Sequence, residues 1–172
     1  FIFLSIIVRI IGAYFFADTR LDNEWGKLVH NLEFSGILGI NVIIDDFTVL
    51  HKFANPGDTV LPSIFMPPLY AYFIYLIKEL FIDLTNYINV IISIQILISL
   101  ITTILFYKIL KNFYNIRIAT IFTAIFSLFP LNIYSSVQIS SITLQLFLLV
   151  FYFFSVLNYY TSSKIKYLVL LS

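Results

Sequence analysis

The sequence contains no cysteine among its 172 residues, which excludes disulfide frameworks, thiolate zinc sites and cysteine nucleophiles. It is also poor in charge, since Asp, Glu, Lys and Arg make up 11% of the chain, against about 25% in soluble domains. The net charge is +1, and the aromatic residues lie in apolar runs rather than among lysines and arginines. Because nucleic-acid surfaces need clustered basic residues, we expect no nucleic-acid partner.

Hydrophobic residues make up 60% of the sequence, and aromatic residues 19%. A membrane-spanning helix needs about 20 mostly apolar residues. Segments that meet or approach this length lie at about 1–16, 87–107, 116–134 and 139–160, and another begins at 165. The pattern predicts an all-α fold, a polytopic integral membrane helix bundle that forms a single membrane domain over 1–172.

Both ends of the sequence have the character of internal segments. The chain begins with Phe1 rather than Met, and an apolar run, KYLVLLS, continues to Ser172. We therefore expect the chain to be truncated at both ends, as the N-terminal part of a larger polytopic protein. Segment 1–16 has no small-residue cleavage site and contains Arg9, so we interpret it as a retained first span rather than a signal peptide.

The segment 17–86, between the first two spans, has a different composition. Its part Ala17–Pro62 holds most of the acidic residues, four of the five glycines and both histidines. Apolar side chains recur there at the helical spacing i, i+3, i+4 and i+7, at Trp25, Leu28, Val29 and Leu32. We expect a long external loop that carries an interfacial helix at about 22–35, ending near Gly36, with Trp25 at headgroup depth.

A second interfacial helix is predicted at about 67–82, where a Pro pair opens an apolar run. Sixteen residues reach about 24 Å as a helix, short of the ~30 Å hydrocarbon core. The basic loops 108–117 and 158–166 are separated by two spans, so both can lie in the cytoplasm, as the positive-inside rule favours. This orientation makes 67–82 enter and leave on the external face, although a true span remains the alternative.

Three acids, Asp18, Asp22 and Glu24, cluster before the first predicted interfacial helix. One interpretation is helix capping, because Thr19-x-x-Asp22 fits a capping box and Asp22 fits an N-cap. The other is chemical. A carboxylate fixed at the membrane surface can act as a general base, or can hold a divalent cation against a phosphate.

The runs DNEWGKLVHNLEFSG and MPPLYAYFIYLIKELF resemble the N-terminal half of the GT-C superfamily of polytopic glycosyltransferases. The branch that they resemble contains the protein O-mannosyltransferases and the aminoarabinose transferases. Its members carry an acid-bearing external loop, then an aromatic-x-x-Leu-Ala-x-Asn-Leu helix and a basic-Pro-Pro-Leu segment. Trp25–Leu32 and Met66–Leu69 occupy the latter two places, and a Pro-containing span with PLNIYSS follows.

The resemblance implies transfer of a sugar from a polyprenyl-phosphate donor to a glycan, lipid or protein acceptor. The reaction would take place at the external face of a bacterial cytoplasmic (inner) membrane. The resemblance implies that Asp22 is the catalytic base, with Glu24 and Asp18 as rivals, and that Asp22 and Glu24 are the ligands of any divalent cation. No organic cofactor is expected.

The expected ligands of the donor phosphate are Arg20, Lys52 and His51. Two positions differ from the family pattern. Met66 stands where the family often has a basic residue, and Ser140–Thr143 stands where it often has an acid. A single-base mechanism and an inactive relative therefore stay open.

Other polar residues have weaker claims to chemistry. Asp45-Asp46, with His51 and Lys52 downstream, has the residue types to bind phosphate and metal, but a solvated loop is the favoured interpretation. His30 lacks the spacing of a metal ligand. Arg9 is costly in lipid, so it is expected to face protein, water or a lipid phosphate, with snorkelling as the rival. Interhelical hydrogen bonds are expected from Gln95, Gln138 and Gln145.

Two alternatives to a transferase remain from the sequence. A transporter or lipid flippase requires ionisable residues or broken helices near the middle of the bilayer, and only Arg9 and Pro130 qualify. A catalytically inactive scaffold predicts that replacing Asp22 costs ~1 kcal/mol through lost capping and has no other effect.

Overall fold

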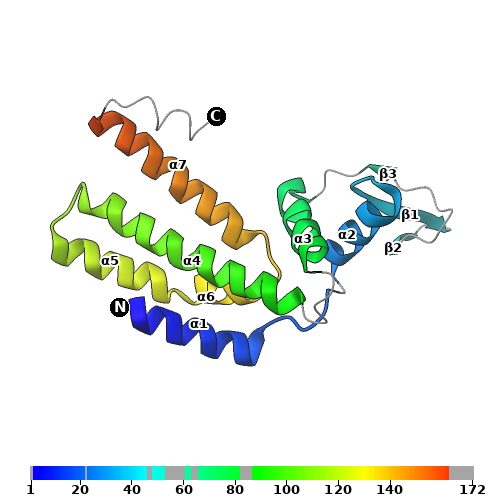
Figure 1. Cartoon of the computed structure of the whole chain (residues 1–172), viewed down its shortest axis with the longest axis horizontal. Helices are drawn as coiled ribbons and strands as arrows, with labels where there is room; N and C mark the ends of the chain where they lie inside the picture. Colours follow the sequence, from blue (N-terminus) through cyan, green and yellow to red (C-terminus); the bar gives the residue numbers. More distant parts are fainter. Residues whose placement is uncertain are drawn as a thin grey trace. The chain divides into compact units, whose positions relative to one another are not determined.

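The computed structural model describes residues 2–21, 23–45, 48–52, 61–62, 66–81 and 87–162 (Figure 1). The chain divides into two compact units. The apolar unit combines Phe1–Ala17 with Ile92–Ser172, and the acidic unit is Asp18–Ile91. All nine acidic residues of the sequence lie in the acidic unit, and the apolar unit has none.

The apolar unit is built from helices. They are α1 (Ile2–Phe16), α4 (Tyr87–Lys111, whose first turn belongs to the acidic unit), α5 (Ile116–Leu128), α6 (Pro130–Val137) and α7 (Ile142–Ser162). Two of them, α4 and α7, are long and apolar enough to cross a membrane. The prediction of membrane-spanning helices is confirmed to that extent, and these two correspond to the expected spans at 87–107 and 139–160.

The expected third span, 116–134, is not one helix. It is divided between α5 and α6, which meet at a bend of 50°. The cause is Pro130, which has no N–H to donate to the carbonyl of Phe126 four residues earlier. That carbonyl accepts instead from the Asn132 side-chain amide at 2.8 Å and from the Phe129 N–H at 3.3 Å.

The acidic unit contains two helices, α2 (Glu24–Ser35) and α3 (Pro68–Leu80). It also contains a small antiparallel sheet that the sequence analysis did not predict. Its strands are β1 (Gly39–Asp45), β2 (Thr48–Lys52) and β3 (Leu61–Pro62), in the order β2-β1-β3. The β-branched residues of INVII and TV favour extended backbone, which explains why these short runs form strands.

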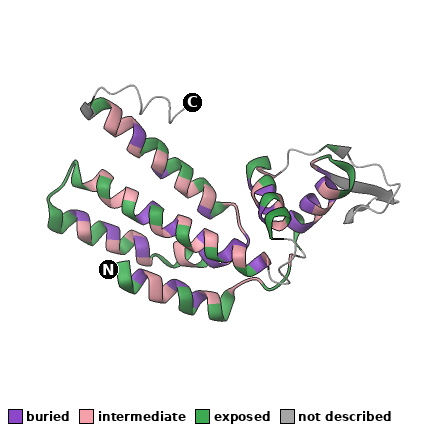
Figure 2. Ribbon diagram, viewed as in Figure 1, coloured by how far each residue is buried: buried purple, intermediate pink, exposed green. Residues whose placement is uncertain are grey.

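The core of the acidic unit lies between α2 and α3 (Figure 2). The apolar face of α2 is buried as periodicity predicted, but protein covers it. Trp25 is 7% exposed, and its ring meets that of Tyr70 edge to face at 4.7 Å. Ile74 and Ile77 of α3 are also buried. α3 therefore supplies the apolar surface that lipid was expected to supply, while the expectation that Trp25 lies at headgroup depth stays a prediction.

The ends of α2 have clear caps. Asn23, rather than Asp22, is the N-cap, and its side-chain oxygen accepts from the Gly26 N–H at 3.3 Å. The capping interpretation of Asp22 is therefore wrong. Gly36 ends the helix as predicted, with a φ of 69° that a glycine adopts without strain. Within the helix, the buried Asn31 side chain donates to the Gly39 carbonyl at 2.8 Å and ties α2 to β1.

Candidate functional site

The predicted acids follow α1 closely. Asp18 is half-buried two residues beyond Phe16, and Arg20 is exposed in the connection to α2. Glu24 is exposed in the first turn of α2. Asp22, the expected base, lies outside the described residues. The described part of this connection therefore presents one carboxylate and one guanidinium to solvent within five residues.

Gly26 allows this connection to fold back onto α2. A Cβ atom placed on Gly26 would lie 1.9 Å from the carbonyl oxygen of Leu21, far inside van der Waals contact. Only a residue without a side chain leaves room for that carbonyl against the first turn. The glycine of the EWGKL run therefore sets the path of the acid-bearing connection, a role that the sequence analysis missed because it appears only in three dimensions.

We expect Gly26→Ala to destabilise the acidic unit by about 1–3 kcal/mol, as overpacking does, because the added methyl group displaces Leu21. Trp25 is the only tryptophan and packs on Tyr70, so its fluorescence reports unfolding of this unit in detergent. Gly36→Asn is the matched control, since Asn tolerates the left-handed conformation and a Cβ there meets nothing within 4 Å. Wild-type stability for Gly26→Ala would contradict the described path of the connection.

The other predicted phosphate and metal residues lie on different elements. His51 and Lys52 end strand β2, Asp45 ends β1, and their side chains, like Asp46, are outside the described residues. His30 on α2 contacts the ring of Phe34, with centroids 5.0 Å apart. In the described part of the chain, no three His, Cys, Asp or Glu side chains form a metal-binding group.

A second polar site lies inside the apolar unit, around Arg9. This side chain is 1% exposed, so snorkelling is excluded and the expectation that it faces protein is confirmed. Its Nε and Nη2 donate to Ser99 Oγ of α4 at 3.1 and 2.9 Å. Its Nη1 donates to the Ser127 carbonyl of α5 at 3.2 Å, and to the carbonyl and hydroxyl of Ser5 one turn earlier on α1. One guanidinium thus joins three helices.

The charge of Arg9 has no carboxylate partner in its unit, because the apolar unit contains no Asp or Glu. Its compensation comes from the end of α5. Ser127 is the penultimate residue of that helix, so its carbonyl belongs to the last turn, which lacks intrahelical donors and carries the negative end of the helix dipole. The bend at Pro130 therefore creates the acceptor that Arg9 uses.

The surroundings of Arg9 are polar but closed. A cavity of about 10 Å³ adjoins Ser99 and is lined by polar side chains of several helices, among them Thr102, Asn132, Ser135 and Thr143. Ligand pockets hold roughly 300–1,000 Å³. This cavity is therefore too small to admit a sugar, and the polar side chains around it pack against one another.

The glutamines act mainly between elements, as predicted for two of them. Gln95 of α4 donates to the Ser140 carbonyl at 3.0 Å, and Gln138 donates to the Phe16 carbonyl at the end of α1. Gln145 donates instead to a hydroxyl four residues earlier, at 3.1 Å, so the interhelical prediction is wrong there. The first two bonds bring the end of α1 and the α6–α7 connection to the end of the unit where α4 begins (Figure 1).

The segment Ser140–Thr143, where the GT-C pattern often has an acid, has a structural role here. The Ser140 hydroxyl accepts from the Ile142 N–H at 3.3 Å, and the Thr143 hydroxyl donates to the Ser135 carbonyl at 2.8 Å. These bonds cap the start of α7 and the end of α6.

In comparisons with known proteins, no family model, curated protein or solved structure matches this chain. The resemblance to GT-C glycosyltransferases therefore stays a prediction that depends on short sequence motifs.

Proposed function

We propose that the chain is a multi-pass protein of a bacterial cytoplasmic membrane, with the acidic unit on the external face. The α4–α5 turn carries Lys108, Lys111 and Arg117, which the positive-inside rule favours in the cytoplasm. The end of α1 lies at the opposite end of α4 from that turn, beside Gln138. The acidic unit follows α1 directly and therefore emerges outside.

The exposed face of α3 supports contact of the acidic unit with the bilayer. While one face packs on α2, apolar side chains between 49% and 68% exposed recur on another, at Leu69, Tyr72, Leu76 and Leu80. Their spacing places them on one stripe of the helix. With 13 residues, α3 reaches only about 20 Å, so it suits a helix lying in the external leaflet better than a span.

Within this arrangement, we propose that the protein transfers a sugar from a polyprenyl-phosphate donor to an acceptor. The observation that carries the proposal is the acid-bearing connection, which starts two residues beyond an apolar helix, is held by the Leu21–Gly26 contact and exposes Glu24. Such a connection lies at the depth of a lipid headgroup. Asp22 would be the base, and Glu24 or Asp18 would be its neighbours or rivals.

In the proposed reaction, the base takes the proton of the acceptor hydroxyl while that oxygen bonds to the anomeric carbon. The bond from that carbon to the polyprenyl phosphate breaks, and the phosphate leaves with the electron pair. A single displacement inverts the anomeric centre. In this proposal the exposed Arg20 would offset the charge of the leaving phosphate, with Lys52 and His51 as further candidates and a divalent cation at Asp22 and Glu24 as an alternative.

The test is a transfer assay with the full-length protein in lipid vesicles and radiolabelled polyprenyl-phosphate sugars. We expect label to pass to acceptor while free polyprenyl phosphate accumulates. Movement of intact donor between leaflets without transfer would establish a flippase instead. Neither transfer nor movement, with any donor sugar, would leave the scaffold interpretation.

Arg9 and the bent pair α5–α6 are the observations that favour the transporter class, since buried charge and broken helices mark many transport pathways. The geometry argues against it. All three guanidinium nitrogens of Arg9 donate within the protein, and the adjoining cavity measures only about 10 Å³. A cation fixed by three helices suits packing better than movement.

A further inference from the structure

We propose that the apolar unit binds an anionic phospholipid of the surrounding bilayer, with an acyl chain in an aromatic groove and the phosphate at the α4–α5 turn. The proposal rests on the membrane orientation given above but not on sugar transfer. The site is distinct from the proposed donor site, because its residues belong to the apolar unit and those of the donor site belong to the acidic unit.

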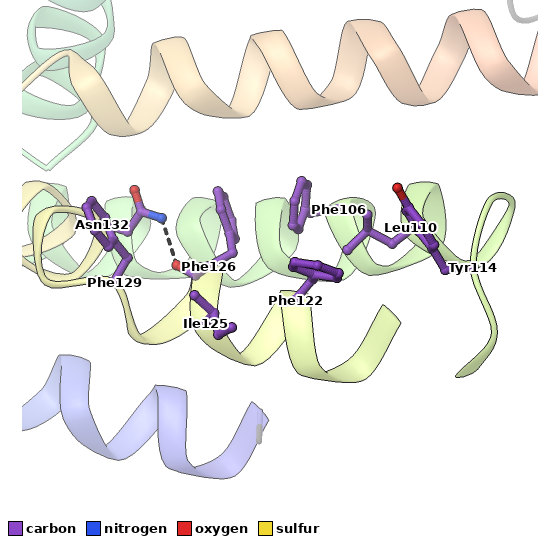
Figure 3. Close-up of a pocket in the computed structure, with 8 residues that line it drawn as sticks. All are labelled: Phe106, Leu110, Tyr114, Phe122, Ile125, Phe126, Phe129 and Asn132. Carbon is purple, nitrogen blue, oxygen red and sulfur yellow. Dashed lines mark hydrogen bonds between the residues drawn. The ribbon is translucent and has the colours of Figure 1, made fainter. Parts of the chain in front are cut away.

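The groove has a volume of about 530 Å³ and is formed by α4, α5 and the start of α6 (Figure 3). Five aromatic rings line it, and Phe106 stacks on Phe126 at 4.3 Å between centroids. Phe122 and Ile125 of its wall are 50% and 60% exposed, so the groove opens outward. Its volume falls within the roughly 300–1,000 Å³ of ligand pockets, and its wall is apolar enough for a hydrocarbon chain.

The two ends of the groove differ in charge. At one end, the Asn132 side-chain amide donates to the Phe126 carbonyl at 2.8 Å (Figure 3), and none of the described residues that line that end is ionisable. At the other end, Tyr114 belongs to the turn between Lys111 and Arg117. This polarity matches a lipid whose chain enters the groove and whose headgroup stays at the turn.

The basic side chains of the turn are available to an anion. Lys108, Lys111 and Arg117 are all exposed. The Lys108 and Lys111 amines lie over aromatic rings, 5.9 and 5.8 Å from the centroids of Phe154 and Tyr107, and neither forms a salt bridge within the described residues. The apolar unit has no acid in its sequence to compete for them. Counter-ions for these three charges therefore come from outside the unit.

A phospholipid phosphate fits this chemistry. Guanidinium and ammonium groups form charge-assisted hydrogen bonds with phosphate oxygens, and basic pockets between membrane helices on the cytoplasmic side bind anionic headgroups. Each basic residue near an anionic lipid surface strengthens binding roughly fivefold. The groove adds apolar contact that a surface charge cluster alone lacks, so binding is expected to persist after extraction from the bilayer.

The experiment compares lipid retention by the full chain after extraction from vesicles of phosphatidylcholine mixed with phosphatidylglycerol. Native mass spectrometry counts the lipids that remain bound in mild detergent. We expect wild type to retain phosphatidylglycerol in preference to phosphatidylcholine. Arg117→Gln is expected to lower this retention about fivefold, and Ile125→Trp, which fills the groove without changing charge, to lower it as well.

The matched control is Lys27→Gln, which removes one positive charge from the acidic unit and is expected to leave retention unchanged. Equal retention of the two lipids, or wild-type retention by Arg117→Gln, would overturn the proposal. An equal loss in Lys27→Gln would also overturn it, by showing attraction to net charge alone. Displacement of the lipid by equimolar polyprenyl phosphate would reassign the groove to the donor. The lipid-retention assay needs no sugar donor, so its result does not depend on whether the transfer assay succeeds.

Discussion

Asp22→Asn is expected to lower the rate of sugar transfer about 10²- to 10⁴-fold, the contribution typical of a general base. The amide keeps the size of the carboxylate but carries no negative charge and cannot take the proton of the acceptor hydroxyl. The measurement is the transfer assay in vesicles at matched protein content. Since Asn23 is the N-cap of α2, the substitution removes no cap. The ~1 kcal/mol loss of stability that the scaffold interpretation predicts for Asp22 is therefore not expected.

Glu79→Gln is the matched control for this variant, because Glu79 is an exposed acid of the same unit on α3, and its transfer rate is expected to equal that of wild type. Glu24→Gln and Asp18→Asn rank the rival acids. A loss in Glu24→Gln with full activity in Asp22→Asn would move the base by two residues. Full activity in all three variants would contradict a catalytic role of the acid-bearing connection.

Helical periodicity carried enough information to predict α2 and its buried face. The spacing of Trp25, Leu28, Val29 and Leu32 depends on local geometry, and Gly36 is a local stop signal, so both were predicted correctly. The sequence of α2 alone does not show what covers its apolar face. Lipid and the side chains of α3 are both apolar, so the pattern could not show that Tyr70 would cover Trp25.

The two polar sites show the same limit. The fold-back at Gly26 depends on a carbonyl only five residues away, yet glycine has no side chain whose chemistry could reveal the contact. The partners of Arg9 lie 90 and 118 residues along the chain, at Ser99 and Ser127. The cost of a charge in an apolar helix predicted that Arg9 needs partners, but no spacing rule connects residues so far apart.

The small sheet escaped prediction for another reason. Its strands are short and lie in a segment rich in acids and glycines, which composition assigns to a loop. The β-branched run in β1 was the available signal. In the antiparallel register, Asn41 pairs with Lys52 and Asp45 with Thr48. The sequence between β1 and β2 lacks the Asn-Gly or Asp-Gly pair that marks a tight hairpin, so the turn gave no signal.

Arg9→Leu is expected to destabilise the apolar unit by about 1–3 kcal/mol, because it leaves the Ser127 carbonyl and the Ser99 hydroxyl buried without their donor. Arg9→Lys is expected to cost at least as much. A lysine ammonium is a single point of charge and cannot donate to Ser99, Ser127 and Ser5 in the fork geometry of a guanidinium, so a buried charge would keep fewer partners. The stability of both variants is measured by the loss of the helical circular dichroism signal as the fraction of denaturing detergent is raised.

The control for Arg9 is Asn112→Ala, where an exposed polar residue of the same unit is expected to change stability by less than about 0.5 kcal/mol. A third variant tests whether the loss of stability comes from the hydrogen bonds between Arg9 and Ser99. Ser99→Ala removes the acceptor shared by Nε and Nη2 and is expected to lower stability in the same direction as Arg9→Leu. In the double variant the two losses are expected to be less than additive, because they remove the same bonds. Full additivity, or wild-type stability of Arg9→Lys, would show that Arg9 does not join α1 to α4 and α5 through these contacts.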